Sequence, residues 1–224
     1  MTDGPTRLGA SLSEALERLE HAIFDPARVA ENDRLAREYE QADQRAKRRE
    51  RLEALGIELE KSTHRQVVAN VGLKDTTSLV AVKRWLTSQS NYPIAVLTGN
   101  RGCGKSVAAA YVVANWDRSA AWSSAPDLIR VFSGNFGDAL KRQDQLKRAR
   151  LLVLDDVGTE GDAIRMCASL IELLDERKQR KTLVTTNLSK EAFLERYSDE
   201  RLHSRLRELA GFVGDKGPDL RGQP

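Results

Sequence analysis

The chain has 224 residues, a formal net charge of +3 at pH 7 and a sequence pI of about 8.9. Hydrophobic residues make up 40% and charged residues 31%, which excludes an intrinsically disordered chain and allows a buried core of moderate size. The two cysteines, Cys103 and Cys167, are too few for a disulfide framework and lack metal-ligand spacing. No apolar run is typical of a signal peptide or a membrane span. We therefore expect a cytoplasmic protein with reduced thiols.

The first part of the chain predicts two helices. Ser11 and Glu14 form a candidate capping box for the first, whose apolar residues recur at helical spacing. A second, very polar helix is expected from Pro26 to about Leu55, with Gly56 as its stop. We expect residues 1–60 to form a helical region, a candidate to bind a partner, and residues 61–224 to form the main domain. For the polar helix, docking on a partner and simple solvation remain equal alternatives.

A strand, a glycine-rich loop and a helix are predicted one after another in the middle of the chain. Residues 78–87 place apolar side chains on one helical face, which predicts a helix. The apolar run 93–98 is typical of a buried parallel strand, and the sequence from Ser106 onward is helical. Between them, the sequence GNRGCGKS at 99–106 matches the full G-x-x-x-x-G-K-[ST] pattern.

This loop pattern indicates an ATP-binding site. Its glycines let backbone N–H groups turn inward as an anion nest, and the next helix directs its positive end at the phosphates. Lys105 is expected to reach the β- and γ-phosphates, and Ser106 to ligate Mg²⁺. The expected nucleotide-binding residues are Gly99, Asn100, Arg101, Gly102, Cys103, Gly104, Lys105 and Ser106. Cys103 is either a redox-sensitive thiol or, as the sequence favours, a small residue tolerated there.

Two carboxylates follow the next predicted strand. The run 151–154 is apolar and ends in Asp155 and Asp156. Ligands gather at the carboxyl ends of parallel strands, so both acids are expected beside the phosphates. Asp155 is the expected Mg²⁺ partner, and Asp156 is placed to orient or deprotonate the attacking water. The alternative is that the pair caps the next turn.

Two further candidate groups lie near the end of the chain. The β-rich run 182–186 ends at Asn187, which is expected either to hold the attacking water or to be a turn residue. Arg201 and Arg205 are four residues apart and share one face of a predicted helix. Either arginine is a candidate to reach a γ-phosphate across a subunit boundary, although an ordinary charged helix surface is the simpler interpretation.

Residues 141–150 are strongly basic and contain only one acid, Asp144. A basic strip that follows a phosphate backbone gives sequence-tolerant binding to single-stranded nucleic acid. A solvated helix face is an equally good interpretation. The candidate nucleic-acid contacts are Lys141, Arg142, Lys147, Arg148 and Arg150.

Taken together, these motifs resemble AAA+ ATPases, and among them the bacterial helicase-loader group (DnaC/DnaI type) and the related IstB transposition ATPases. The resemblance rests on the loop 99–106, on LLVLDDVG at 151–158 and on TLVTTNL at 182–188. Residues 122–129, 201–206 and 217–221 add to it, so that it covers roughly residues 55–222.

The resemblance implies a three-layer α/β P-loop fold with a mainly parallel five-stranded sheet, preceded by a helical region and without a separate lid domain. By position it implies that Asn187 is sensor 1 and that Arg205 is the arginine finger, with Arg201 as the runner-up. It also implies that Arg221 is a nucleotide-sensing arginine. Asp156 stands where most AAA+ proteins carry Glu, so slow turnover is expected.

The function implied is that of an ATP-dependent DNA replication helicase loader. It would bind single-stranded DNA and a hexameric replicative helicase, assemble with copies of itself, and release the helicase on ATP hydrolysis. An IstB-like helper of a DNA transposase is the alternative. A GTPase is disfavoured because the sequence contains no Asn-Lys-x-Asp motif, and a small-molecule kinase because it would need a mobile, arginine-rich lid. The set of Lys105, Ser106 and Asp155 argues against an inactive relative.

Overall fold

The computed structural model describes residue 14 and residues 26–57, 62–87 and 92–220. The chain divides into two compact units, Met1–Ala46 and Lys47–Pro224. Apart from Glu14, which is helical, the predicted first helix and its capping box lie outside the described residues. Within the described residues, no helix combines the length and the apolar character needed to cross a membrane.

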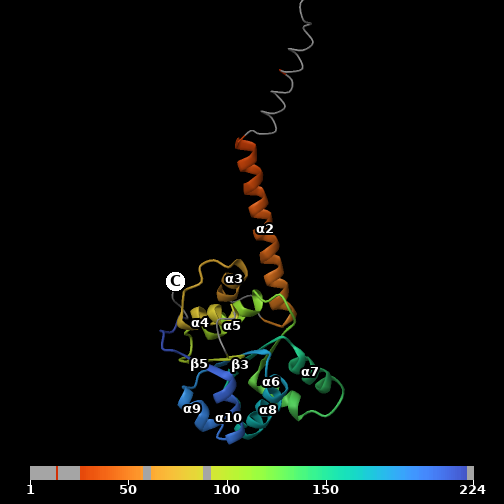
Figure 1. The fold of residues 1–224 in the computed structure, drawn as a ribbon, viewed down its shortest axis with the longest axis vertical. Coiled ribbons are helices and arrows are strands. Elements are labelled where there is room, and N and C mark those ends of the chain that lie inside the picture. Colours follow the sequence, from red (N-terminus) through yellow and green to blue (C-terminus); the bar gives the residue numbers. More distant parts are fainter. Residues whose placement is uncertain (1–13, 15–25, 58–61, 88–91, 221–224) are drawn as a thin grey trace, which may run out of the picture. The chain divides into compact units, whose positions relative to one another are not determined.

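The second unit is built on a single sheet of five parallel strands in the order β2-β3-β4-β1-β5 (Figure 1). This confirms the predicted fold class. β1 lies between β4 and β5, so β4 separates it from β3. The strands are β1 (Ile94–Gly99), β2 (Ala120–Ser124), β3 (Leu151–Val157), β4 (Lys181–Thr186) and β5 (Ala210–Asp215).

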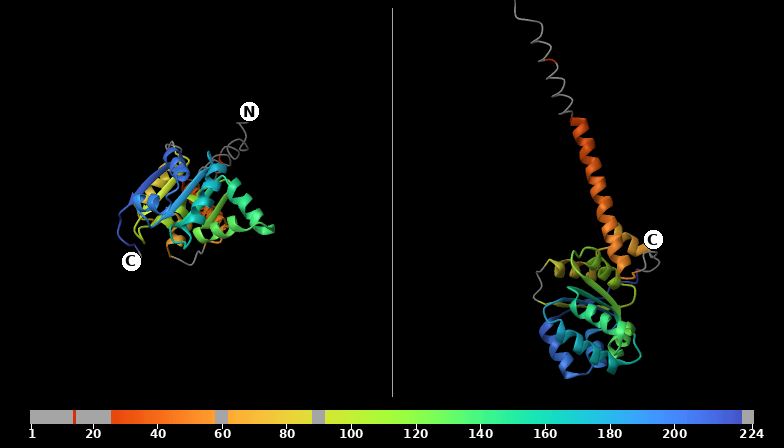
Figure 2. Two further views of the ribbon diagram at one scale, coloured as in Figure 1. Left: turned by 90° about the horizontal axis from the view of Figure 1, so that it is seen from below. Right: turned by 90° about the vertical axis from the view of Figure 1, so that its right-hand side faces the viewer.

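Helices cover both faces of the sheet, which gives the three predicted layers (Figures 1 and 2). Alternate residues of β1 enter different cores: Ile94 and Val96 face one, and Ala95 and Leu97 face the other. The core of Ala95 and Leu97 contains α3 (Ser62–Ala69), α4 (Thr77–Leu86) and α5 (Lys105–Ala114). The opposite face is covered by α6 (Ala125–Ser133), α7 (Gly137–Arg148), α8 (Ala163–Glu176), α9 (Lys190–Arg196) and α10 (Glu200–Leu209).

The long polar helix is present as α2 (Pro26–Ala54), as predicted. Gly56 follows it with a φ of 70°, a left-handed conformation that suits glycine at a helix end. In the second unit, Leu52 is fully buried, and the Arg51 guanidinium donates a hydrogen bond of 2.9 Å to the carbonyl of Ala114. The last turns of α2 are therefore part of the core of the second unit.

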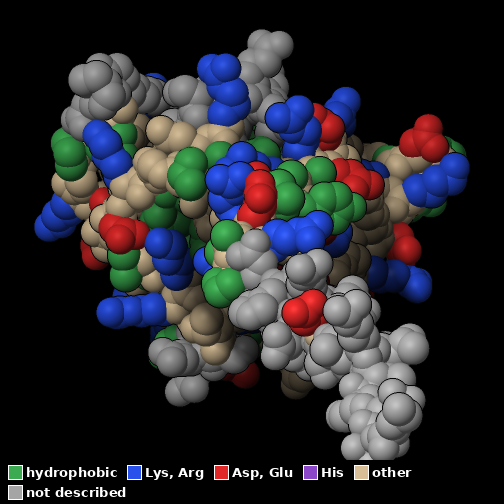
Figure 3. Space-filling model, turned by 90° about the horizontal axis from the view of Figure 1, so that it is seen from above, with side chains coloured by type: hydrophobic (Ala, Val, Ile, Leu, Met, Phe, Trp, Pro, Cys, Tyr) green, Lys and Arg blue, Asp and Glu red, His purple; other side chains and the backbone are tan. Residues whose placement is uncertain are grey.

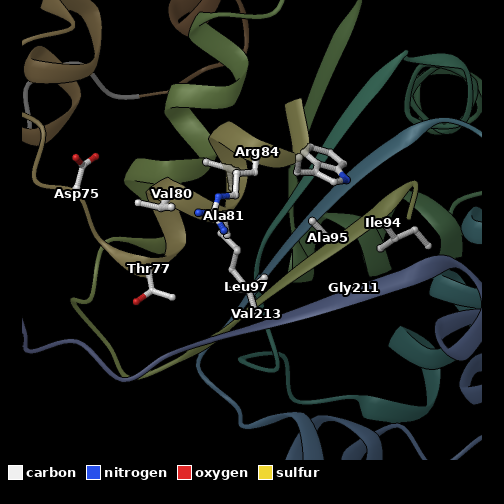
Figure 4. A pocket seen from close by; sticks show the side chains of 12 residues that line it. Asp75, Thr77, Val80, Ala81, Arg84, Ile94, Ala95, Leu97, Gly211 and Val213 are labelled. Carbon is white, nitrogen blue, oxygen red and sulfur yellow. The ribbon is translucent and has the colours of Figure 1, made fainter. Parts of the chain in front are cut away.

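A pocket of about 670 Å³ lies between α4 and the strands β1 and β5 (Figure 4). Its lining is mainly apolar and includes Val80, Leu97 and Val213, with the charged side chains of Asp75 and Arg84. No residue of the loop 99–106 lines it. The pocket is therefore separate from the loop 99–106.

One buried arginine, Arg177, supports the edge of the sheet at which the parallel strands begin. Arg177 follows α8 and is only 1% exposed. Burial lowers its pKa to about 10, so the guanidinium keeps its charge at neutral pH. Its nitrogens donate hydrogen bonds to the Thr182 hydroxyl and to the carbonyls of Leu146, Lys147, Ala149 and Lys181. One side chain thus joins the end of α7 to the start of β4.

Replacement of Arg177 by Met should lower the free energy of unfolding by about 3–5 kcal/mol, because several buried carbonyls lose their donor together. Urea denaturation at pH 7 measures this loss. Lys178→Met is the matched control, since Lys178 is exposed, and it should cost less than about 0.5 kcal/mol. Equal losses for the two variants would contradict the bracing role.

Candidate nucleotide-binding site

The three predicted motifs meet at the carboxyl edge of the sheet. Because β1, β3 and β4 are parallel, the residues that follow them emerge at the same edge. The loop 99–106 leaves β1, Asp155 and Asp156 end β3, and Asn187 follows β4. Since β4 lies between the other two strands, its end is placed to contact both sides of the site.

The loop after β1 has the strand–loop–helix geometry that the sequence predicted. Gly99 has a φ of 136°, and a Cβ there would lie 1.9 Å from the carbonyl oxygen of Asp215, so only glycine fits. Gly104, with a φ of 99°, is the N-cap of α5. The amide N–H groups of the first turn of α5 have no partner within the helix and attract anions.

Lys105 is folded into this loop. The side chain is 5% exposed, and its ammonium donates hydrogen bonds to the carbonyls of Gly99 at 2.9 Å and Asn100 at 2.6 Å. The positive charge is therefore held at the mouth of the anion nest, where a phosphate would meet it. The thiol of Cys103 is buried and donates to the carbonyl of Asn100, which fits a small packing residue.

Ser106 and Asp155 are in direct contact although they are far apart in sequence. The Ser106 hydroxyl donates to Oδ1 of Asp155 at 3.0 Å. Hydroxyl and carboxylate oxygens are ligands that Mg²⁺ prefers, and Mg²⁺ usually takes only one or two protein ligands together with phosphate and water. Among the described residues, no group of three or more His, Cys, Asp and Glu could hold a metal by itself. The donor set thus fits an ion shared with a nucleotide.

Asp156 and Asn187 also lie together. The Asn187 amide donates to Oδ1 of Asp156 at 3.3 Å, and Asp156 is exposed. Asp156 has a φ of 56°, a left-handed conformation that is uncommon for residues other than glycine. The carboxylate and amide that were predicted to handle a water molecule are therefore neighbours.

Another residue of the site, Thr185 on β4, was not predicted. Its side chain is fully buried, and its hydroxyl contacts both acids of β3. In the sequence it is one threonine of the run TLVTTN, where β-branched residues are expected merely because they favour strands.

A buried carboxylate that was also not predicted anchors the loop after the two acids. Oε2 of Glu160 accepts the N–H of Gly158 at 2.8 Å, and Oε1 accepts the Tyr197 hydroxyl at 2.5 Å and Nε of Arg196 at 3.1 Å. Burial and the neighbouring Glu160 carboxylate raise the pKa of Tyr197. The cluster joins the loop after β3 to the end of α9 and so supports the segment that carries Asp156.

The two candidate arginines of α10 are both bound to acids of the protein. The Arg205 guanidinium donates to Asp175 on α8 at 2.7 Å and, through that hydrogen bond, lowers the pKa of the Asp175 carboxyl. Arg201 pairs with Asp199, the N-cap of α10. Asp175 is near the end of α8, and α10 leads directly into the start of β5. Arg205 therefore lies toward the amino edge of the sheet, opposite the loop 99–106.

The basic segment 141–150 is not one uniform strip. Lys147 pairs with Glu172 at 2.6 Å, and Arg142 donates to the carbonyl of Trp122 at 2.7 Å, so both are half-buried. The exposed members also bind near neighbours: Lys141 pairs with Asp138 and Arg148 with Asp144, while the backbone N–H of Arg150 donates to the Ser119 hydroxyl. On the face in Figure 3, basic and acidic side chains are likewise interspersed.

The end of the described chain packs against the loop. The N–H of Leu220 donates to the carbonyl of Gly102 at 3.0 Å, and a Cβ on Gly102 would lie 1.8 Å from Asp219. The buried Asp215 carboxylate accepts the N–H groups of Ser78 and Gly217 at 2.9 Å. Arg221, the predicted nucleotide-sensing arginine, lies outside the described residues.

A family model described as Nephrocystin 3, N-terminal matches residues 75–196, more than half of the chain. The chain belongs to this family. The matched segment contains the loop 99–106, both acids of β3, and Asn187. No curated protein sequence matches the chain.

Several solved structures share the fold. The crystal structure of DnaI has a TM-score of 0.53 and 21% identity, covering 73% of this chain and 92% of that one. The replication initiator DnaA bound to AMPPCP and single-stranded DNA has a TM-score of 0.51 and 17% identity, and the match covers 66% of this chain and 49% of that one. Domain III of Thermotoga maritima DnaA has a TM-score of 0.50 and 18% identity, and the match covers 66% of both chains. The chain thus shares the fold of DnaI and of these DnaA structures, in agreement with the predicted fold.

Proposed function

We propose that this protein is an ATPase that binds Mg-ATP at the loop 99–106. The observation that carries the proposal is the contact between Ser106 and Asp155 at the mouth of a loop that already holds the Lys105 ammonium. In this arrangement the loop amides and Lys105 bind the phosphates. Mg²⁺ bound by Ser106 and, through water, by Asp155 would neutralise negative charge on the β- and γ-phosphates.

Hydrolysis requires a water molecule aligned with the γ-phosphate. Asp156 and Asn187 are the groups proposed to hold this water, and their contact at 3.3 Å places acceptor and donor side by side. Asp156 accepts a proton from the water, while the Asn187 amide fixes its position. The short side chain of Asp156 gives less reach than a glutamate, so we expect slow turnover.

Arg205 is proposed to act on the nucleotide of a neighbouring copy. It lies toward the edge of the sheet opposite its own loop, so it cannot complete the site that its own chain provides. To reach a neighbour's γ-phosphate, the guanidinium must leave Asp175, to which it is bound at 2.7 Å. On assembly, Arg205 would then exchange the Asp175 carboxylate for the γ-phosphate bound by the neighbouring copy.

The cellular role that we propose is loading of a hexameric replicative helicase, with residues 1–60 as the helicase-binding region. Single-stranded DNA would contact the surface near α7. There, Phe136 at the N-cap is 86% exposed, Leu140 is 50% exposed, and Lys141 follows. An exposed aromatic ring beside a lysine offers both stacking and charge to an unpaired strand. ATP hydrolysis would release the helicase from the assembly.

Lys105→Ala should weaken ATP binding by about 10–100-fold, because a charge-assisted hydrogen bond to phosphate is worth about 1.5–3 kcal/mol. Isothermal titration with ATP and Mg²⁺ measures the change. Lys178→Ala, on the exposed end of the α8–β4 connection, should bind ATP like the wild type. Undiminished binding by Lys105→Ala would contradict the site assignment.

Arg205→Ala should leave ATP affinity unchanged but lower turnover on the order of a hundredfold or more, since the neighbour's site loses its finger. Asp175→Ala is the matched control, because it breaks the same ion pair and keeps the arginine. Steady-state ATPase assays should show wild-type or higher turnover for Asp175→Ala. If both variants lose turnover equally, the pair has only a structural role.

Co-elution with the replicative helicase of the same organism, in the presence of ATP and single-stranded DNA, tests the cellular role. We expect a stable complex that is lost when residues 1–46 are deleted, a deletion that leaves the unit Lys47–Pro224 whole. Absence of a complex together with DNA-stimulated ATPase activity would contradict the loader role and favour the transposase helper.

A further inference from the structure

We infer that Thr185 is the positioning residue that aims both catalytic-site acids, acting through its hydroxyl and without touching nucleotide or metal. The inference rests on the proposed ATP site. It starts from an irregularity in the sheet: β3 and β4 are in register at Leu154 and Val184 and again at Val157 and Thr186. Two residues of β3 therefore face one residue of β4, which is the pattern of a β-bulge.

The bulge changes what the two acids can reach. In a regular strand, successive side chains point to opposite faces of the sheet, so Asp155 and Asp156 would diverge. Here the extra residue and the φ of 56° at Asp156 let Asp155 face Ser106 while Asp156 meets Asn187. Bulges often redirect a side chain beside an active site.

The residue of β4 opposite the bulge is Thr185, and its hydroxyl makes hydrogen bonds to the two bulged residues of β3. Its oxygen accepts the backbone N–H of Asp156 at 2.9 Å, and its proton is donated to Oδ1 of Asp155 at 2.6 Å. An N–H can only donate and an ionised carboxylate can only accept, so the direction of both bonds is fixed. One buried hydroxyl therefore determines the backbone of one acid and the carboxylate of the other.

Both bonds serve the proposed chemistry. Oδ1 of Asp155 accepts hydroxyl protons from Ser106 and from Thr185. Under the proposed function the Ser106 oxygen would also bind the metal, whereas the partners of the Thr185 hydroxyl are Asp155 and the N–H of Asp156. The left-handed conformation of Asp156 is unfavourable by itself and persists only where surrounding contacts impose it. The bond from its N–H to Thr185 is one such contact, and the Thr159 hydroxyl, which donates to its carbonyl at 2.8 Å, is another.

A purely structural role for Thr185 predicts different behaviour. Thr185 is 0% exposed, and valine has nearly the same shape, so packing alone would survive its replacement by valine. The same strand offers a control in Thr182, which is also 0% exposed and whose hydroxyl accepts Nε of Arg177 at 3.1 Å, far from the acids. Loss of either hydroxyl removes a buried hydrogen bond, but only Thr185 contacts the acids.

The test compares Thr185→Val, Thr185→Ser and Thr182→Val in the full chain. ATP affinity is measured by titration calorimetry as a function of Mg²⁺ concentration, and turnover and melting temperature are recorded for each variant. For Thr185→Val we expect unchanged ATP affinity without Mg²⁺, a Mg²⁺ requirement raised about tenfold, as is usual when a residue supporting a metal ligand is lost, and reduced turnover. Thr185→Ser should restore the wild-type Mg²⁺ requirement. Thr182→Val should lower the melting temperature and leave that requirement unchanged.

The inference is overturned if Thr185→Val keeps the wild-type Mg²⁺ requirement and turnover, if Thr185→Ser is impaired to the same degree, or if Thr182→Val shifts the requirement equally. Should the valine variant fail to fold, Thr185→Ala, which also removes the hydroxyl, takes its place with the same expected and contradicting results. A wild-type chain that shows no Mg²⁺-dependent ATP binding would contradict the proposed function itself and remove the basis of the inference.

Discussion

The hydrogen bond between Ser106 and Asp155 depends on how the parallel strands are ordered. Ser106 begins α5 after β1, Asp155 ends β3, and β4 lies between these strands, so the two side chains meet across the carboxyl end of β4. A strand placed there must end without blocking this contact. β4 also supplies polar groups to the site, since Thr185 contacts both acids of β3 and Asn187 contacts Asp156.

The supports of this edge come from parts of the chain that are distant in sequence. Glu160, buried behind the acids, ties their loop to Arg196 and Tyr197 of the next helical layer. On the other side of the loop 99–106, the carbonyl of Asp215 approaches Gly99 so closely that no side chain fits there. At the opposite edge, Arg177 holds the start of β4. Buried charged groups with several hydrogen-bond partners fix such positions because any loosening leaves them unpaired in a medium of low polarity.

Local sequence patterns were enough to predict the elements that have a continuous apolar run or a specific motif. The apolar runs before Gly99 and Asp155 and the spacing of Gly99, Gly104 and Lys105 predicted two strands, a loop and their common edge. The short strands β2 and β5 carry little such signal, since AAWSS and AGFVGD are rich in Ala, Ser and Gly, which do not favour strands. Those two strands were implied only by the family resemblance.

The long-range partners could not be predicted for a different reason. Glu160, Arg177 and Thr185 gain their roles from residues 37, 31 and 30 positions away, through the fold and not through local spacing. The bulge opposite Thr185 is a register shift between two strands and leaves no trace in either strand alone. The basic segment 141–150 is a different case, because its charge is evident in the sequence but the partners of its side chains are not. Arg142 binds the carbonyl of Trp122 and Lys147 binds the carboxylate of Glu172.

The central claim is that one edge of the sheet binds a magnesium nucleotide through Lys105, Ser106 and Asp155. Its most direct test is a crystal structure of the chain with a non-hydrolysable ATP analogue and Mn²⁺ in place of Mg²⁺, with anomalous scattering used to locate the ion. The account predicts phosphates inside the loop 99–106, with the ion bonded to Oγ of Ser106 and adjacent to Asp155. Nucleotide bound elsewhere, or an ion that contacts neither Ser106 nor Asp155, would contradict it.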